Sequence, residues 1–344
     1  MPISPSSGNE RPDRRKALDF LSLPKAEIHI HLEGCFDPED IEALAKDAGV
    51  PLPRSRENLY DTSGLSNFLA FLDWTCGLVR TREQLAGAAY AFSRRMHLSG
   101  VRYADVIVNP THWAHWHDRI PDMIDALDGG FAAAEQDGFA PARLCISLLR
   151  KQTSEQAIEL VELLTALKHP RVVALSVDGN EAAAGRTGPR FAEAYRRAAL
   201  GGLRRTAHAG ESSGPEGVRD ALDLLRVERI DHGVRVIEDA ELVKRLVDEQ
   251  IALGITPTSN ITLGLYGGYD SHPFEALRKA GVPVSVNTDD PSPLSINLPQ
   301  EYANMANANG WDKETVRAVA RTSITASFAE PELKASMLRD LADW

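Results

Sequence analysis

Eight short apolar segments recur along this chain, and each is followed by a segment of helical character. The apolar segments are one that ends at His31 and then 101–108, 143–149, 172–177, 203–207, 229–231, 251–254 and 282–287. Strands that alternate with helices pair in parallel, because each helix carries the chain back to the start of the sheet. Eight such units in one chain favour an α/β fold, the closed (β/α)8 TIM barrel.

The predicted barrel has a helical insertion after its first strand, as the segments there are 37–49, 65–79 and 83–98. Residues 1–15 are polar and contain Pro, Ser and Gly, which predicts a disordered tail. No Gly- or Ser-rich linker divides the rest of the chain. We therefore expect residues 16–344 to form a single domain.

Charge and cysteine content restrict the partners and the compartment. Asp and Glu number 49 against 38 Lys and Arg, so the net charge is −11, and an acidic surface repels nucleic acid. The widely spaced Cys35, Cys76 and Cys145 indicate a reducing, cytoplasmic setting rather than a disulfide framework. No run of about 18 apolar residues predicts a membrane span. We expect a small-molecule substrate, and the sequence allows a homo-oligomer.

The first strand carries two histidines on one face. Side chains alternate along a strand, so His29 and His31 point one way while Ile28 and Ile30 point toward packing. This pattern suits two ligands of one metal ion, but it is also typical of two hydrogen-bonded core histidines. The ends of the other strands decide between these interpretations, because active sites of such barrels form there.

Polar residues follow four other predicted strands. They are DGNE (178–181), HAGE (208–211), DHG (231–233) and NTDDP (287–291). Because the carboxyl ends of the strands share one face of a barrel, these residues are expected to meet His29 and His31.

Three imidazoles and one carboxylate from these strand ends form a ligand set that suits zinc: His29, His31, His208 and Asp289. Zinc would lower the pKa of a bound water to about 7 and so produce hydroxide at neutral pH. A two-metal amidohydrolase usually needs a carboxylated lysine at a strand end, and the segment 172–177 contains none. We expect one zinc per chain.

Five motifs in order carry a resemblance to a known family. LPKAEIHIHLEG (23–34), HAGE (208–211), RIDHGV (229–234), PTSN (257–260) and NTDDP (287–291) resemble those of the adenosine deaminase family of the amidohydrolase superfamily. Each motif alone is weak, but five in order are specific, and they extend from about Leu23 to Tyr302. The resemblance implies a barrel of the metal-dependent hydrolase type, one zinc, and hydrolytic removal of the 6-amino group of a purine.

The resemblance also implies roles for individual residues. Glu211 would donate a proton to purine N1, and His232 would orient the attacking hydroxide as a general base or an electrostatic partner. Asp289 would be both a metal ligand and part of the catalytic group. On the substrate side, Asp290 would hydrogen-bond purine N7 and the Gly179 backbone N–H would meet N3. His31 and Glu33 would complete the substrate-binding residues.

The chain departs from the family pattern at two positions that face the substrate. Adenosine-specific relatives usually carry Asp at the position of Glu33, where the side chain contacts ribose, and Glu also occurs in relatives that act on free adenine or other purines. The fourth-strand motif usually has an apolar residue before its glycine, where this chain has Asp178. We therefore expect Glu33 to set specificity rather than chemistry.

Two further features have structural and functional interpretations. The segment Thr111–His117 contains three histidines and two tryptophans, and we expect a pocket-lining loop, with Trp113 or Trp116 stacking, rather than a second metal site. Cys35 follows the first ligand strand, and a packed thiol is its more usual role.

Several functions remain open at this point. Deamination of adenosine to inosine and ammonia comes first, followed by deamination of adenine or a modified 6-aminopurine. A two-metal amidohydrolase, such as an amidase or phosphoesterase, would use the same barrel and bind a second ion. A binding or signalling barrel would bind zinc without deaminase activity.

Overall fold

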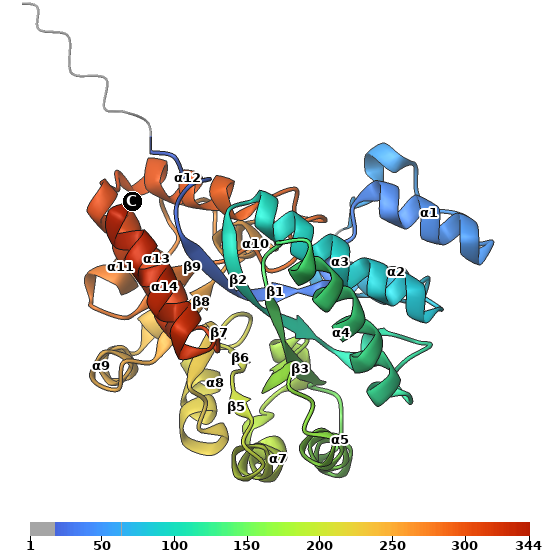
Figure 1. Ribbon diagram of the computed structural model, residues 1–344. Helices are drawn as coiled ribbons and strands as arrows, with labels where there is room; N and C mark the ends of the chain where they lie inside the picture. The colour runs from blue at the N-terminus through green and yellow to red at the C-terminus, as the bar shows by residue number, and fades with distance from the viewer. Residues whose placement is uncertain (1–17, 63) are drawn as a thin grey trace, which may run out of the picture.

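The computed structural model describes residues 18–62 and 64–344, and it places parallel strands at the centre with helices around them (Figure 1). The strands are β1 (Lys25–His31), β2 (Val101–Val108), β3 (Ala142–Leu149), β4 (Val172–Asp178), β5 (Arg204–Arg205), β6 (His208–Ala209), β7 (Arg229–His232), β8 (Ala252–Ile255) and β9 (Val284–Val286). The helices are α1 (Pro38–Ala48), α2 (Gly64–Cys76), α3 (Arg82–Leu98), α4 (Ile120–Gln136), α5 (Ser154–Leu167), α6 (Glu181–Ala184), α7 (Gly188–Leu200), α8 (Pro215–Asp220), α9 (Ala240–Asp248), α10 (Pro257–Thr262), α11 (Phe274–Lys279), α12 (Leu298–Asn309), α13 (Lys313–Ala326) and α14 (Pro331–Asp343). The predicted tail at 1–15 lies outside the described residues.

The strands form two parallel arcs, β1 to β5 and β6 to β9, in sequence order. Backbone hydrogen bonds join the arcs at both edges. The Thr206 N–H donates to Leu175 O at 3.0 Å, and the Asp231 N–H donates to Ala207 O at 2.9 Å, so one segment pairs first with β4 and then with β7. At the other edge, the His31 N–H donates to Asp289 O at 2.8 Å. The result is the (β/α)8 arrangement that the alternation of segments predicts.

The predicted fifth strand, 203–207, is divided in the structure. Residues 204–205 pair with β4 and residues 208–209 with β7, with Thr206 and Ala207 between them. The chain changes its neighbour there, and neither half is long enough to keep one continuous ladder.

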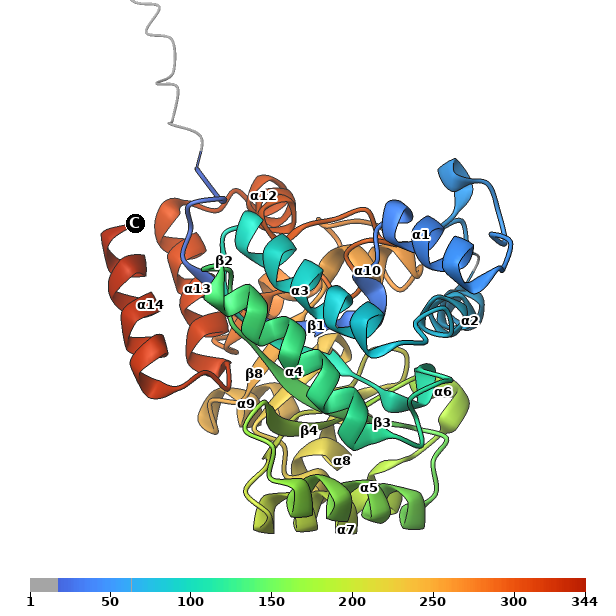
Figure 2. The ribbon, with the colours of Figure 1, turned by 45° about the vertical axis from the view of Figure 1, so that its right-hand side comes forward.

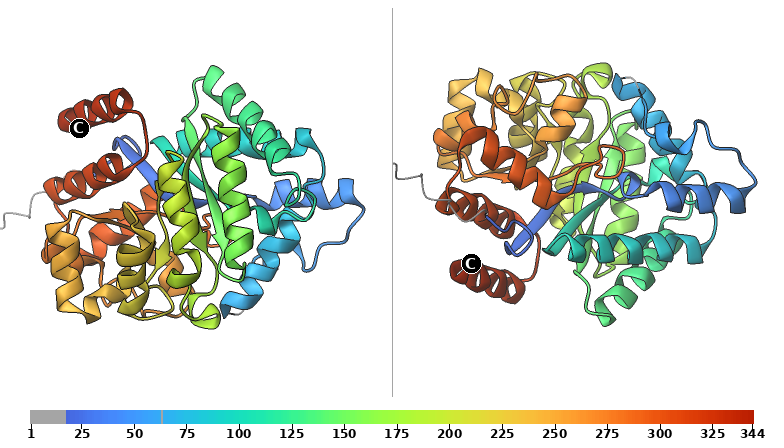
Figure 3. Two further views of the ribbon diagram at one scale, coloured as in Figure 1. Left: turned by 90° about the horizontal axis from the view of Figure 1, so that it is seen from below. Right: turned by 90° about the horizontal axis from the view of Figure 1, so that it is seen from above.

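The predicted helical insertion follows β1, and α1 and α2 project beyond the barrel on one side (Figures 1 and 2). Asp37 and Asp40 form a capping box at the start of α1, and Gly49, with φ of 67°, ends it. Around the barrel, α3 lies along α4 (Figure 2) and α5 along α7 (Figure 3). Among the described residues, no helix combines the length and apolarity that crossing a membrane requires.

An arginine at the start of β7 fills part of the barrel interior. Arg229 is fully buried, forms an ion pair with Asp105, and donates to Ile28 O at 2.9 Å. Its guanidinium lies 4.1 Å from the ring centroid of Phe328. A buried charge is tolerated only when it is paired and hydrogen-bonded, so this group ties β7 to β1 and β2. The opposite end of β7 is His232.

Candidate metal centre and purine pocket

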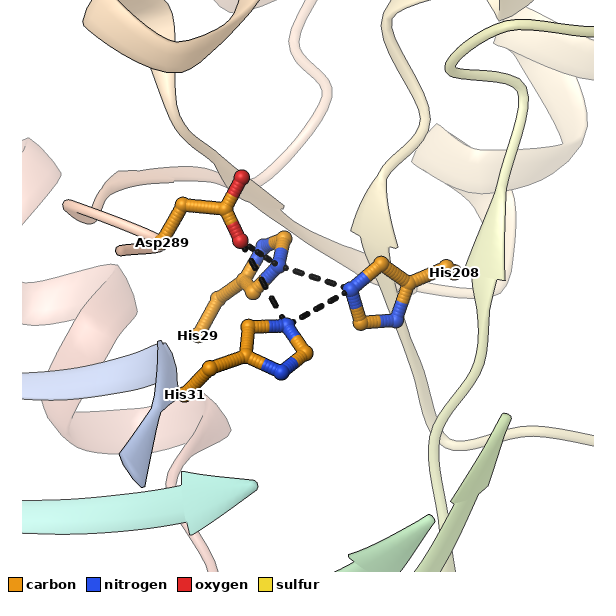
Figure 4. Close-up of side chains that lie close together, drawn as sticks. All are labelled: His29, His31, His208 and Asp289. Atoms are coloured by element: carbon orange, nitrogen blue, oxygen red, sulfur yellow. Dashed lines mark hydrogen bonds and ion pairs between the residues drawn. The ribbon is translucent and has the colours of Figure 1, made fainter. Parts of the chain in front are cut away.

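Four side chains from three parts of the chain converge where the strands end (Figure 4). His29 Nε2 and His31 Nε2 lie 3.1 Å and 3.0 Å from His208 Nε2. Asp289 Oδ1 lies 3.2 Å from His29 Nε2 and 3.4 Å from His31 Nε2. All four donor atoms lie within 4.8 Å of one another. The structure therefore brings together the four predicted ligands.

This arrangement fits a single metal ion. The Nδ1 atom of His29 lies 2.8 Å from Gly254 O, so Nδ1 carries the proton and the Nε2 lone pair faces the cluster. Separations of 3.0 to 3.4 Å are of the size expected for ligands that share one ion at about 2 Å. Nitrogen and carboxylate donors in this ratio suit zinc. The described residues contain no second group of this kind, and β4 carries no lysine.

Asp289 is held by both its backbone and its side chain. It adopts φ of 66°, an uncommon conformation for a residue with a side chain, and Ser259 donates to its Oδ2 atom at 2.7 Å. Burial alone would raise the pKa of this carboxyl, but His29 beside it holds the pKa well below its usual range. The group is therefore anionic, as a carboxylate ligand of a metal ion would have to be.

Glu211 lies in a loop whose shape depends on a second carboxylate. The buried side chain of Glu181 accepts the backbone N–H groups of Gly210, Glu211 and Ser213, each at 3.1 Å. Burial, followed by the charges of Asp289 and Glu181, raises the pKa of Glu211 to about 8. A carboxyl that keeps its proton near neutral pH can act as a proton donor.

His232 is buried beside the cluster. Its Nε2 atom lies 3.5 Å from Glu211 Oε1 and 4.0 Å from Asp289 Oδ2. The side chain is 1% exposed, and its Nδ1 atom faces away toward Thr256 at 3.0 Å. His232 therefore presents one ring nitrogen to the reacting region.

A cavity extends from the cluster. Glu33, Gly179 and Asp290, the residues predicted to contact substrate, all lie in its wall with His31. Glu33 Oε1 accepts from the Asn109 N–H at 2.8 Å and from Trp113 Nε1 at 2.7 Å, whereas Oε2 is buried and has no hydrogen-bond partner. Asp290 Oδ1 is likewise buried without a partner. Two unpaired polar positions in one wall indicate a ligand that carries polar atoms.

The pKa values of the two acids that face this cavity, Glu33 and Asp290, are both raised. Burial raises the pKa of Glu33, while the nearby His112 and His31 oppose that rise. Burial and then the negative charges of Asp289, Glu33 and two further acids raise the pKa of Asp290 well above its ordinary range. Gly179 adopts φ of 96°, which a residue with a side chain would adopt only under strain.

An apolar helix forms the rest of the wall, where Leu65, Phe68, Leu69 and Leu72 of α2 line the cavity. The predicted stacking by Trp113 or Trp116 is wrong. Trp113 is fully buried behind Glu33, and Trp116 donates its Nε1–H to Val79 O at 2.9 Å. The loop Thr111–His117 instead places His112 in the wall, where its Nδ1 atom lies 2.5 Å from Asp73 Oδ1.

Cys35 has the packed position that the sequence predicts, whereas Arg150 is a residue of the site that the sequence did not identify. Cys35 is buried outside the cavity wall and donates its thiol to His31 O at 3.0 Å, so it is a packed thiol. The sequence assigned no role to Arg150, whose Nε donates to Gly179 O at 3.1 Å and whose Nη2 donates to His208 O. Arg150 directly follows β3, and its place at a strand end was the signal that could have identified it.

Comparisons with known proteins agree with this geometry. The sequence profile described as adenosine deaminase matches residues 24–344. An adenine deaminase of Rhodospirillum rubrum is 33% identical over 326 residues, which cover 93% of this chain and 96% of that protein.

Two solved structures have the same fold. The crystal structure of an adenine deaminase from Arthrobacter aurescens has a TM-score of 0.88 and 31% identity, covering 94% of this chain and 99% of that one. A zinc-bound amidohydrolase from Burkholderia ambifaria has a TM-score of 0.86 and 27% identity, covering 96% and 94% of the two chains. The predicted (β/α)8 fold is confirmed.

Proposed function

Because this chain belongs to the adenosine deaminase family and is a hydrolase of carbon–nitrogen bonds, we propose that it removes the 6-amino group of the free base adenine, with one zinc ion per chain. The products would be hypoxanthine and ammonia. The sequence placed adenosine first and adenine second, and the relatives named adenine deaminase favour the second.

The proposed choice of substrate rests on the unpaired Oε2 atom of Glu33. A carboxylate oxygen can only accept a hydrogen bond, and this one is buried in the pocket wall with no donor from the protein. Free adenine has a ring N–H at N9, whereas adenosine carries ribose there and has no N–H on the ring to donate. The free base can therefore pair with this acceptor directly from its ring, whereas the nucleoside would need room for a ribose hydroxyl to reach it.

The remaining polar groups suit the other ring nitrogens, which accept hydrogen bonds. Glu211, with its pKa raised to about 8, would protonate N1 and make C6 more electrophilic. The Gly179 backbone would meet N3 and Asp290 would face N7, since both lie in the wall of the same cavity. The apolar side chains of α2 would cover the ring face and exclude water.

His29, His31, His208 and Asp289 would hold the zinc ion. When bound, zinc would act as a Lewis acid that activates the attacking water. His232 would orient that water from the side of Glu211, 3.5 Å away.

The proposal also concerns the setting of the enzyme. Cys35, Cys76 and Cys145 are unpaired and buried, which suits the reducing cytoplasm. We place the enzyme there, as a monomer or a homo-oligomer that acts on a small molecule.

Steady-state assays of adenine and adenosine, read by ammonia release, test the choice of substrate. The wild type should have the higher kcat/KM with adenine. In Glu33→Ala, kcat/KM should fall roughly five- to 150-fold for adenine, because the N9–H loses its acceptor, and less for adenosine. Glu33→Gln, which keeps the size of the side chain, separates the lost charge from the lost volume.

Metal content should remain near one equivalent in both variants. Equal losses on both substrates would show that Glu33 supports the fold or the metal instead. A wild type that prefers adenosine would overturn adenine as the substrate.

A further inference from the structure

A chain of buried hydrogen bonds leads from the backbone to His232, and its first donor is unambiguous. The Phe274 N–H donates to His272 Nδ1 at 3.2 Å. Because Nδ1 accepts this bond, the neutral ring of His272 carries its proton on Nε2. That Nε2–H donates to Asn260 Oδ1 at 3.1 Å. His272 is 4% exposed and Asn260 is fully buried, so no solvent competes for these groups.

The orientation of the Asn260 amide determines which ring nitrogen of His232 carries the proton. With Oδ1 facing His272, its Nδ2 group faces His232 Nδ1 at 3.3 Å, and an amide NH2 can only donate. The hydroxyl of Thr256 also contacts His232 Nδ1, at 3.0 Å, but a hydroxyl can donate or accept and does not decide the matter. His232 Nδ1 is therefore the acceptor, and the ring proton lies on Nε2.

We propose that Asn260 and His272 are positioning residues that hold His232 as its Nε2–H tautomer, so that it acts as a hydrogen-bond donor to the attacking oxygen and not as a general base. The tautomer follows from the hydrogen bonds alone. Its consequence for the reaction rests on the proposed deaminase function. His232 Nε2 is the atom that faces Glu211 and Asp289. A nitrogen that already carries a proton has no lone pair with which to take another.

The orientation of the Asn260 amide is not free to reverse. Reversal would place its NH2 group against the Nε2–H of His272, with two donors 3.1 Å apart in a buried position. An unpaired buried donor disfavours that state by roughly five- to 150-fold. The short helix α10 that carries Asn260 is itself anchored, because the Thr258 N–H donates to the buried Glu301 of α12 at 2.6 Å.

The tautomer can be measured directly by NMR on metal-loaded protein labelled with ¹⁵N at its histidines. Of the ten histidines, His232 is identified by the signals that disappear in His232→Gln. We expect Nδ1 of His232 to show the shift of an unprotonated nitrogen and Nε2 that of a protonated one. The opposite pattern in the wild type would overturn the proposal.

Asn260→Asp tests the control of the tautomer. A carboxylate at this place accepts from both rings, so the proton of His232 should move from Nε2 to Nδ1 in the NMR spectrum. Loss of the donor should lower kcat by roughly 10²- to 10³-fold and leave KM for adenine nearly unchanged. A variant that folds and keeps the Nε2–H tautomer would refute the role of Asn260.

Matched variants complete the test. Asn297→Asp adds the same charge at the N-cap of α12 and should change neither the tautomer nor kcat. His272→Gln keeps a donor for Asn260 and should retain the Nε2–H tautomer, whereas His272→Phe removes the donor and should yield a mixture. Equal NMR spectra for these two would exclude a role for His272. If adenine is not the substrate, the NMR results stand unchanged, which separates the two proposals.

Discussion

Replacing Glu181 by glutamine should destabilise the loop that carries Glu211. Glu181 accepts three backbone N–H bonds at 3.1 Å, from Gly210 on Oε1 and from Glu211 and Ser213 on Oε2. A glutamine has only one acceptor oxygen. If that oxygen takes the Oε2 position, its NH2 group faces the Gly210 N–H, and one bond is lost.

The magnitude follows from these contacts. A hydrogen bond to a charged acceptor contributes about 1.5–3 kcal/mol, and the two bonds that remain become weaker without the charge. We therefore expect the free energy of unfolding to fall by about 2–3 kcal/mol. The backbone N–H of Glu211 is one of the three groups that Glu181 binds. Displacement of the loop should therefore also lower kcat at least tenfold, which corresponds to about 1.4 kcal/mol in the activation barrier.

Urea unfolding and ammonia-release kinetics measure both effects. Glu216→Gln is the matched control, because Glu216 lies in the first turn of α8, directly after this loop, but is exposed and accepts one N–H, from Gly214 at 3.2 Å. Its free energy of unfolding should change by less than about 0.5 kcal/mol. If Glu181→Gln and Glu216→Gln unfold at the same urea concentration, the assignment of Glu181 as the support of this loop is refuted.

Three further predictions follow from the same geometry. His208→Ala should lose the metal and the activity together in elemental analysis and assay, whereas the exposed His117→Ala should lose neither. Since burial raises the pKa of Glu211 to about 8 and the protonated form is the donor, kcat should fall as pH rises through 8. Glu211→Gln should keep the metal, lower kcat by about 10²–10⁴-fold, and lack this pH limb; a loss below tenfold would contradict the role. Burial lowers the pKa of His272 from 6.5 to about 4, so the unfolded chain binds the proton first and stability should fall by up to about 3 kcal/mol as pH drops from 6.5 to 4. In urea titrations at several pH values, His272→Gln should flatten this loss, and an unchanged slope would count against it.

Local patterns in the sequence were enough for most of the fold. Each strand and helix is encoded by neighbouring residues, as Asp37 and Gly49 bound α1 and the apolar run 101–108 forms β2. The order of these elements leads to the barrel, because parallel strands joined by helices have few other arrangements. The four candidate ligands could be named for the same reason, since each lies in or just after the carboxyl end of a strand, and strand ends share one face.

Tertiary structure decided what depends on distant segments. His112, rather than the predicted Trp113 or Trp116, reaches the cavity, because the packing of α2 against the loop determines which side chain lines the wall. The division of the fifth strand likewise results from a change of neighbour, from β4 to β7.

The tautomer of His232 is the clearest example of a property that only the tertiary structure decides. The sequence allowed a general base or an electrostatic partner, and nothing near His232 in the chain distinguishes them. The choice depends on Asn260 and His272, which lie 28 and 40 residues further on. Tertiary packing places Asn260 against the ring and His272 against Asn260. Residue types determine which groups are available, whereas the direction of each hydrogen bond is a property of the packed structure, because it depends on which donor faces which acceptor.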